Sequence, residues 1–115
     1  MTGTSYDAIG VVEVSFYSNA VYLLDVMEKA AEIEFLTAEK LLGGRLVTLI
    51  VGGTTSEVDA AVHAANLAGE NMVNNPVKVA ITISNPNSEI MKYVIGGFNH
   101  EAMEKQKEKN DNVKK

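Results

Sequence analysis

The chain has no cysteine and no tryptophan among its 115 residues, and it has only two histidines and two prolines. The lack of cysteine excludes disulfides, Cys-ligated zinc, Cys-ligated iron–sulfur clusters and thiol nucleophiles. The histidines, His63 and His100, lie far apart in the sequence, so little conventional catalytic equipment remains. A chain of this length suits one domain, and its core can fold without disulfides or a structural metal.

Basic residues are scarce in most of the chain. Residues 1–99 hold five basic residues against eleven acidic ones, whereas residues 100–115 hold five lysines against four acids. An acidic body without a basic face argues against nucleic acid or an anionic membrane as partner. No apolar run approaches the ~20 residues of a membrane span, and the first seven residues lack the pattern of a signal peptide. We therefore expect a cytoplasmic protein.

Four segments have the composition of β-strands: residues 8–14, 33–39, 46–51 and 77–83. The first is β-branched and mostly apolar, and Glu13 is its charged residue. This composition predicts a strand that is covered on at least one face. The third is the most apolar run of the chain and the best candidate for a central strand. Because Gly43-Gly44 separates the second segment from the third, we expect these two strands to form a hairpin.

Two helices are predicted between the strands. The first has apolar residues at intervals of three and four, namely Ala20, Leu23, Leu24, Met27 and Ala31. Ser18 is expected to cap it, with Tyr17 and Tyr22 as a hydrophobic staple. The second, which is rich in alanine, opens with a Thr-x-x-Glu capping box at Thr54 and Glu57.

The order strand, helix, strand, strand, helix, strand predicts an α+β, ferredoxin-like βαββαβ fold on a four-stranded antiparallel sheet. Asn85-Pro86 supplies an N-cap followed by proline at the first helical position, so a short third helix over Ser88–Ile95 is expected. The chain then divides into a flexible N-terminus over 1–7, a domain over 8–95 and a polar tail over 96–115. We expect this tail to be solvated or disordered, or at most a frayed helix.

Several residues invite a chemical interpretation. Gly43-Gly44-Arg45 is a weak phosphate-loop candidate, because a P-loop needs a lysine after its glycines and joins a strand to a helix. Gly52-Gly53-Thr54 does precede a helix, where an anion could bind, although Thr54 and Glu57 can already satisfy the free amides. His63 lies in the alanine- and valine-rich stretch 61–65, which favours a surface or interface role over metal binding or base catalysis. Glu13 could be a general base if buried alone, but capping or pairing is the simpler interpretation. We assign no catalytic residue and no metal site.

Together, the segments resemble the bacterial microcompartment (BMC) shell domain of the single-domain, hexamer-forming type. This is the building block of carboxysome and metabolosome shells. The resemblance rests on the order and spacing of residues 8–13, 25–31, 38–40, 46–53 and 58–69, and it covers about three-quarters of the chain. It implies a structural role without a cofactor: six copies form a hexamer with a central pore, and hexamers tile into a shell that confines enzymes and passes small metabolites. The implied partners are other copies, other shell proteins, the encapsulated enzymes and those metabolites.

The resemblance assigns this role to Lys29 and to the loop at 42–45. Lys29 falls on the family's edge lysine, although an ordinary solvated lysine near a helix end would look the same. Leu42, Gly43, Gly44 and Arg45 fall on the pore loop, which is one residue longer than the usual Gly-Ser-Gly type. If Arg45 faces the six-fold axis, six guanidinium groups would favour anions in the pore. If Arg45 instead belongs to the start of the strand, it pairs with Glu39 or faces solvent, and Leu42 with Gly44 lines the opening.

Asn85 replaces the arginine of the family's Pro-Arg-Pro type edge motif, which removes a fork of hydrogen-bond donors. Either Lys29 and other contacts suffice, or this is a weakly tiling or specialised subunit. The resemblance therefore predicts a hexamer that tiles less readily than typical members. The main rival hypothesis is a ferredoxin-like regulatory or ligand-binding oligomer of the nitrogen-sensor type. A minor rival is a small cofactor-free enzyme that uses Glu13 or His63.

Overall fold

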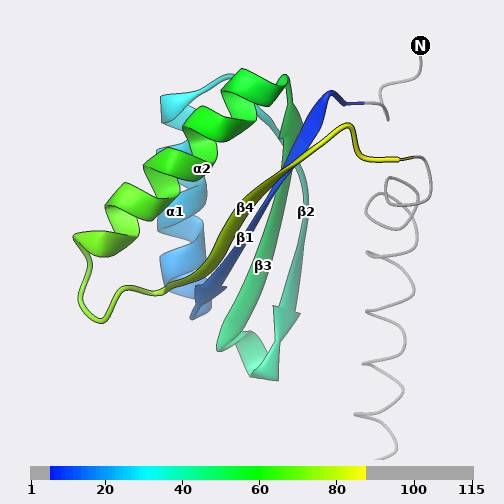
Figure 1. The fold of residues 1–115 in the computed structure, drawn as a ribbon. Coiled ribbons are helices and arrows are strands. Elements are labelled where there is room, and N and C mark those ends of the chain that lie inside the picture. The colour runs from blue at the N-terminus through cyan, green and yellow to red at the C-terminus, as the bar shows by residue number, and fades with distance from the viewer. Residues whose placement is uncertain (1–5, 88–115) are drawn as a thin grey trace, which may run out of the picture.

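A four-stranded antiparallel sheet carries two helices on one of its faces (Figure 1). The computed structural model describes residues 6–87. Along the chain, the elements are β1 (Ala8–Ser15), α1 (Tyr17–Ala30), β2 (Glu34–Leu41), the 3-10 turn η1 (Leu42–Gly44), β3 (Leu46–Gly53), α2 (Thr55–Glu70) and β4 (Val77–Ser84). The strand order is β2-β3-β1-β4. This is the predicted ferredoxin-like arrangement, and all four strands and both helices lie where the sequence placed them to within a few residues.

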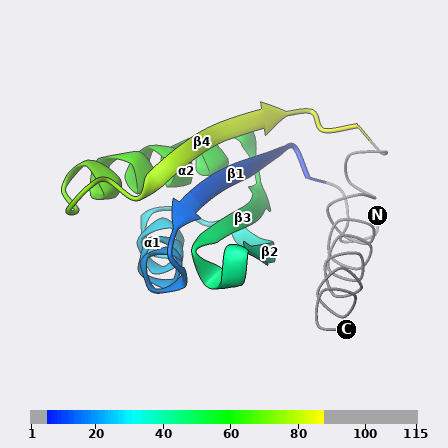
Figure 2. The ribbon, with the colours of Figure 1, turned by 90° about the horizontal axis from the view of Figure 1, so that it is seen from below.

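The hydrophobic core lies between the sheet and the two helices, which also pack against each other (Figure 2). On β1 and β3 the helix-facing positions are Val12, Val14, Val47, Leu49 and Val51, all of them buried. The predicted apolar stripe of α1 supplies Ala20, Leu23 and Met27. The corresponding stripe of α2 supplies Val58, Ala61, Val62 and Ala65. This face of the sheet is therefore covered by apolar residues that alternate along the strands and recur every three or four residues along the helices, as the periods of the two elements require.

Small residues let α2 approach the sheet closely. A Cβ added to Gly10 of β1 would lie 3.1 Å from a methyl group of each of Val51, Val58 and Val62. Real Cβ atoms rarely come this near to three packed methyl groups at once. Gly10 therefore sets the separation between β1 and α2.

The start of α1 differs from the prediction. The helix begins at Tyr17 after Phe16, whose φ of 70° turns the chain, and no side chain caps it. Ser18 is therefore not the N-cap, and the Tyr17–Tyr22 staple is not formed, because Tyr17 lies inside the helix and both tyrosines are exposed. The cause is tertiary: the Ser15 N–H donates to the Pro76 carbonyl and the Phe16 N–H to the Arg45 carbonyl, both at 2.8 Å.

The start of α2 confirms half of the capping box. The Glu57 N–H donates to Thr54 Oγ1 at 3.2 Å, as predicted. The Glu57 carboxylate, however, accepts from the Glu32 N–H at 2.8 Å instead of reaching back to Thr54. The side chain expected to close a local box thus ties α2 to the loop before β2.

The segment after β4 departs from the prediction at Asn85-Pro86. Asn85 has a φ of 50°, which is not an N-cap conformation, and Pro86 and Asn87 are not helical. The Asn85 N–H donates to the Asp7 carbonyl at 2.8 Å, which extends the pairing of β4 with β1. The helix expected over Ser88–Ile95 and the tail expected over 96–115 lie outside the described residues, as does most of the expected flexible N-terminus.

Candidate functional site

The loop between β2 and β3 is a tight turn held by three consecutive residues with positive φ. Leu41 of β2 pairs with Leu46 of β3, and between them Leu42, Gly43 and Gly44 have φ values of 55°, 67° and 89°. Glycine adopts this conformation freely, whereas a leucine there costs about 1–2 kcal/mol. The side chain of Leu42 is 60% exposed at the turn. The structure therefore presents a strained, exposed leucine where the sequence predicts the pore loop.

Arg45 closes this loop against its own backbone. Its N–H and its side-chain Nε both donate to the Leu42 carbonyl, at 3.3 Å and 3.1 Å. Among residues 6–87 the ion pair that forms is Lys29–Asp25, so the interpretation in which Arg45 pairs with Glu39 is wrong. Arg45 lies directly before β3 and is exposed. Two interpretations remain open, in which its guanidinium faces solvent or a pore axis.

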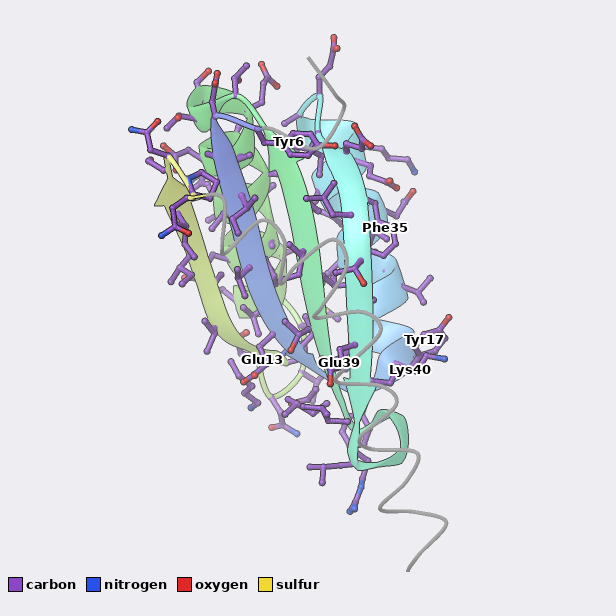
Figure 3. All side chains as sticks on the ribbon, turned by 90° about the vertical axis from the view of Figure 1, so that its right-hand side faces the viewer. Tyr6, Glu13, Tyr17, Phe35, Glu39 and Lys40 are labelled. Atoms are coloured by element: carbon purple, nitrogen blue, oxygen red, sulfur yellow. The ribbon has the colours of Figure 1, made fainter. Side chains whose placement is uncertain are left out.

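An exposed aromatic pair next to the loop was missed by the sequence reasoning. The ring of Tyr17 lies under Lys40, whose Nζ is 4.1 Å from the ring centroid (Figure 3). Phe16 and Tyr17 are about half exposed, and a Cβ on Gly44 would lie 3.8 Å from the Tyr17 Cβ. The signal in the sequence was the adjacent Phe16-Tyr17 pair at a strand-to-helix junction, of which only Tyr17 entered the prediction, as the partner of Tyr22 in the staple.

Lys29 and Asn85 lie at the end of the fold opposite the loop. The register pairs Ala8 with Ser84, so β1 begins where β4 ends and Asn85 follows. The last turn of α1, which holds Lys29, leads into the start of β2 at this same end, whereas η1 follows the far end of β2. An eight-residue strand spans roughly 26 Å. One sheet length thus separates the predicted edge residues from the predicted pore loop (Figure 1).

Lys29 is exposed and carries a local ion pair. Its Nζ lies 2.9 Å from the Asp25 carboxylate one helical turn earlier. The hydrogen bond to Asp25 raises the pKa of Lys29 above its usual value, so the lysine is charged at neutral pH. An exposed pair of this kind contributes little stability, which leaves the ammonium able to exchange Asp25 for another acceptor.

The other candidate residues do not gather into a catalytic site in the described part of the chain. His63 is exposed on α2, and residues 6–87 hold no group of three or more potential ligands suited to a metal ion. Glu13 lies on the sheet face away from the helices, where Thr48 separates it from Glu39 on the next strand. Burial raises the pKa of the Glu39 carboxyl (Figure 3). This cross-strand row of two acids was not foreseen, because only the register brings it together.

The fold defines a ferredoxin-like α+β protein with its exposed loop at one end. A family model described as the BMC domain matches residues 8–86, so this chain belongs to the BMC-domain family. The resemblance stated from the sequence is confirmed. None of the helices within residues 6–87 is long and apolar enough to cross a membrane.

Two relatives are named as shell proteins of carboxysomes or other bacterial microcompartments. The chain is similar to the carboxysome shell protein CsoS1A of Hydrogenovibrio crunogenus, with 36% identity over 83 residues, which cover 72% of this chain and 84% of that protein. It is also similar to the bacterial microcompartment shell protein PduA of Salmonella typhimurium, with 33% identity over 92 residues, covering 80% of this chain and 95% of that protein.

A solved microcompartments protein from Desulfitobacterium hafniense has the same fold, with a TM-score of 0.64 and 22% identity. The match covers 78% of this chain but only 47% of that larger protein.

Proposed function

We propose that this chain is a structural, non-enzymatic shell subunit of a bacterial microcompartment in the bacterial cytoplasm. Six copies form a cyclic homohexamer with a central pore, and hexamers tile with other shell proteins around encapsulated enzymes. The observation that carries this proposal is the separation of the β2–β3 loop from Lys29 and Asn85 by the length of the sheet. In a radial arrangement, one end of each subunit then meets the axis and the other end meets the neighbouring hexamer.

The oligomeric state tests this proposal directly. Native mass spectrometry of the purified chain should give a hexamer, and electron microscopy should show six-fold discs with a central hole. A trimer that binds a small anionic effector and does not assemble into sheets would support the nitrogen-sensor hypothesis and contradict the shell proposal.

In this proposal the loop lines the pore, and Arg45 sets its charge. Six Arg45 side chains near the axis would favour anionic metabolites and oppose cations. The bond from Arg45 Nε to the Leu42 carbonyl holds the side chain at the loop and leaves the other guanidinium nitrogens for solutes. The pore opening would then be lined by the exposed Leu42 together with Arg45.

Arg45→Ala in the assembled hexamer should reduce anion flux through the pore and make the pore potential less positive. Lys40→Ala is the matched control, because it removes one positive charge near the same end but from the side chain that stacks on Tyr17. Anion flux that is the same in the wild type and in Arg45→Ala would remove Arg45 from the pore.

In this proposal Lys29 carries the contact between hexamers, and Asn85 weakens it by offering fewer donors than arginine. Lys29→Ala should leave the hexamer intact but abolish extended sheets in electron micrographs. Lys78→Ala, an exposed lysine on β4, is the control for loss of charge. Extended sheets that persist in Lys29→Ala would show that the edge lies elsewhere.

Asn85 also has a conformational reason to differ from arginine. Its φ of 50° lies in the left-handed region, which asparagine tolerates better than most residues. Asn85→Arg should therefore promote sheet formation while lowering the free energy of unfolding by about 1 kcal/mol.

A further inference from the structure

The turn between α2 and β4 holds an apolar side chain out in solvent. Val73 is 88% exposed, the largest exposed fraction of any large apolar residue in the described part of the chain. Hydrogen bonds fix the backbone on the β4 side of it. The Asn75 N–H donates to the Met72 carbonyl at 3.2 Å, and the Pro76 carbonyl accepts from the Ser15 N–H at 2.8 Å. Val73 is therefore exposed on an ordered turn that is tied to the sheet.

A second exposed apolar surface lies on α1. Tyr17 and Val21 are one helical turn apart, so they share a side of the helix, and they are 49% and 51% exposed. We call these two residues the α1 patch. Lys40 of β2 lies over the Tyr17 ring, which places the patch on the β2 side of the fold (Figure 3). The turn that carries Val73 lies on the other side, because it leads into β4, the edge strand opposite β2.

Both surfaces lie at the end of the sheet that holds the β2–β3 loop. Ser15 ends β1 and bonds to Pro76 at the foot of the α2–β4 turn. The next residue, Phe16, donates its N–H to the Arg45 carbonyl directly after the loop and leads into α1. The turn, the start of α1 and the predicted pore loop are thus joined by backbone hydrogen bonds at one end of the subunit.

The two surfaces carry opposite charges beside their apolar residues. Glu70, the last residue of α2, is exposed, and the last turn of this helix holds no basic residue, so the negative end of the helix dipole adds to its charge. Beside the α1 patch, the Lys40 ammonium lies 4.1 Å from the centre of the Tyr17 ring. Within residues 6–87, Glu70 forms no ion pair with Lys40 or with the exposed Lys78 of β4. Glu70 is therefore free to meet a cation of another molecule.

We propose that the α2–β4 turn of one copy docks on the α1 patch of the next copy in the ring, with Val73 on Tyr17 and Val21 and with Glu70 beside Lys40. This contact rests on the proposed hexamer, because a closed head-to-tail ring needs two different surfaces that match each other. One chain supplies both surfaces, apolar with apolar and anion with cation, on opposite sides of the end that holds the loop. A second copy of this chain is therefore the occupant that fits both surfaces at once.

The absence of cysteine makes a clean disulfide test possible in the full-length chain. Val21→Cys is combined with Val73→Cys, which leaves Tyr17 and Lys40 in place. Under mild oxidation this double variant should give interchain products on denaturing, non-reducing gels, in a ladder that ends at six chains. The matched control pairs Val21→Cys with Ala60→Cys, an exposed position nearer the start of α2. The control should form interchain products at least about 10-fold more slowly, because its thiols do not meet in the ring.

The single-cysteine chains test the direction of the contact. Val21→Cys alone and Val73→Cys alone should run as monomers on the same gels, because a head-to-tail contact sets two different residues against each other. Disulfide-linked dimers of either single variant would indicate a two-fold contact and overturn the proposal. An intrachain disulfide in the double variant, or equal rates in the double variant and its control, would overturn it as well.

A charged residue at the turn tests how much the contact contributes to assembly. Val73→Asp should raise the concentration at which the hexamer dissociates about 10-fold or more, because it sets a carboxylate against the apolar α1 patch. Ala60→Asp adds the same charge elsewhere on α2 and should leave the hexamer unchanged. Native mass spectrometry over a dilution series measures both, and circular dichroism checks that each variant is folded. Equal dissociation of the two variants would show that the turn lies outside the contact.

Charge reversal tests the ion pair separately. Glu70→Lys should weaken each contact about two- to fivefold, the effect expected of one exposed ion pair. The same change places a cation at the end of α2, which the helix dipole favours, so the subunit itself should remain folded. Adding Lys40→Glu in the same chain should restore the wild-type dissociation concentration. A double variant as weak as Glu70→Lys would show that Glu70 does not lie beside Lys40.

The wild-type chain separates failure of this contact from failure of the shell proposal. Native mass spectrometry of the wild type reports the hexamer without any substitution. A wild-type hexamer in which residues 21 and 73 do not cross-link between chains would overturn only the docking of the turn. A wild-type chain that forms no hexamer would overturn both proposals.

Discussion

The two faces of the sheet are built on the same strands but differ in what they contribute. On the covered face, β1 and β3 present only glycine and aliphatic residues to the helices, and the aliphatic ones are almost completely buried. On the open face, which is the side of the sheet away from α1 and α2, the same strands alternate to Ile9, Glu13, Thr48 and Ile50, a mixture of apolar, polar and charged groups. The covered face therefore contributes most of the packing that stabilises the domain. The other face carries polar and charged side chains that are not needed to pack a core.

The largest expected difference between the faces is in the effect of a truncated side chain. Leu23 of α1 is fully buried against the covered face, so Leu23→Ala should lower the free energy of unfolding by about 2–5 kcal/mol. Ile81 on the open face is 48% exposed, and Ile81→Ala should cost about 1 kcal/mol or less. Urea unfolding monitored by circular dichroism measures both. Equal costs would mean that the open face is as well packed as the covered one.

A second comparison concerns added volume. Gly10→Ala would push a methyl group to 3.1 Å from three valine side chains of the covered face. Overpacking in such a place destabilises by about 1–2 kcal/mol. Gly53→Ala is the control, because its new Cβ meets nothing nearer than 3.4 Å and alanine restricts the unfolded chain. Thermal unfolding should show a lower Tm for Gly10→Ala only; a Gly10→Ala variant as stable as the control would show that α2 can move away from β1.

The smallest expected difference is in pH dependence. On the open face, burial and then a hydrogen bond to Glu34 raise the pKa of Tyr6 to about 12. Because the folded-state pKa exceeds the unfolded value, the stability from neutral Tyr6 is complete below about pH 10 and is lost as the pH rises toward 12.

Above pH 10, the free energy of unfolding of Tyr6→Phe should therefore fall less steeply with rising pH than that of the wild type. The difference should be small because the phenol is largely solvated. Urea unfolding between pH 8 and pH 12 measures the difference, and Tyr22→Phe on the exposed side of α1 controls for the loss of a phenol. Parallel curves for the wild type and Tyr6→Phe would contradict the assigned contact.

Much of the fold was predictable because its signals are local. The strands alternate or run apolar, the helices show a period of three and four, and Gly43-Gly44 marks the hairpin. Thr54 caps α2 as predicted, since a hydroxyl at this position reaches an amide three residues later within the same segment. The family resemblance followed from the same segments and is confirmed by the match over residues 8–86.

The errors lie where a distant contact decides the local conformation. Phe16 takes a positive φ because its N–H must meet the Arg45 carbonyl across the fold, which overrides the Ser18 cap. The Glu57 carboxylate accepts from the Glu32 N–H instead of closing the capping box, and the Asn85 N–H donates to the Asp7 carbonyl instead of Asn85 starting a helix. In each case the competing partner is 25 or more residues away in the sequence, beyond the range of a pattern.

The order of the elements, the buried stripes and the family could all be predicted from the amino-acid sequence, because periodicity and capping act within a few residues. Three features arise only from contacts between distant segments: Lys29 and Asn85 share one end of the sheet, the Arg45 side chain closes the loop on Leu42, and Glu13 and Glu39 lie on either side of Thr48. Strand register explains why a local pattern does not reveal them, since which residues of separate strands become neighbours depends on all the pairings of the sheet at once.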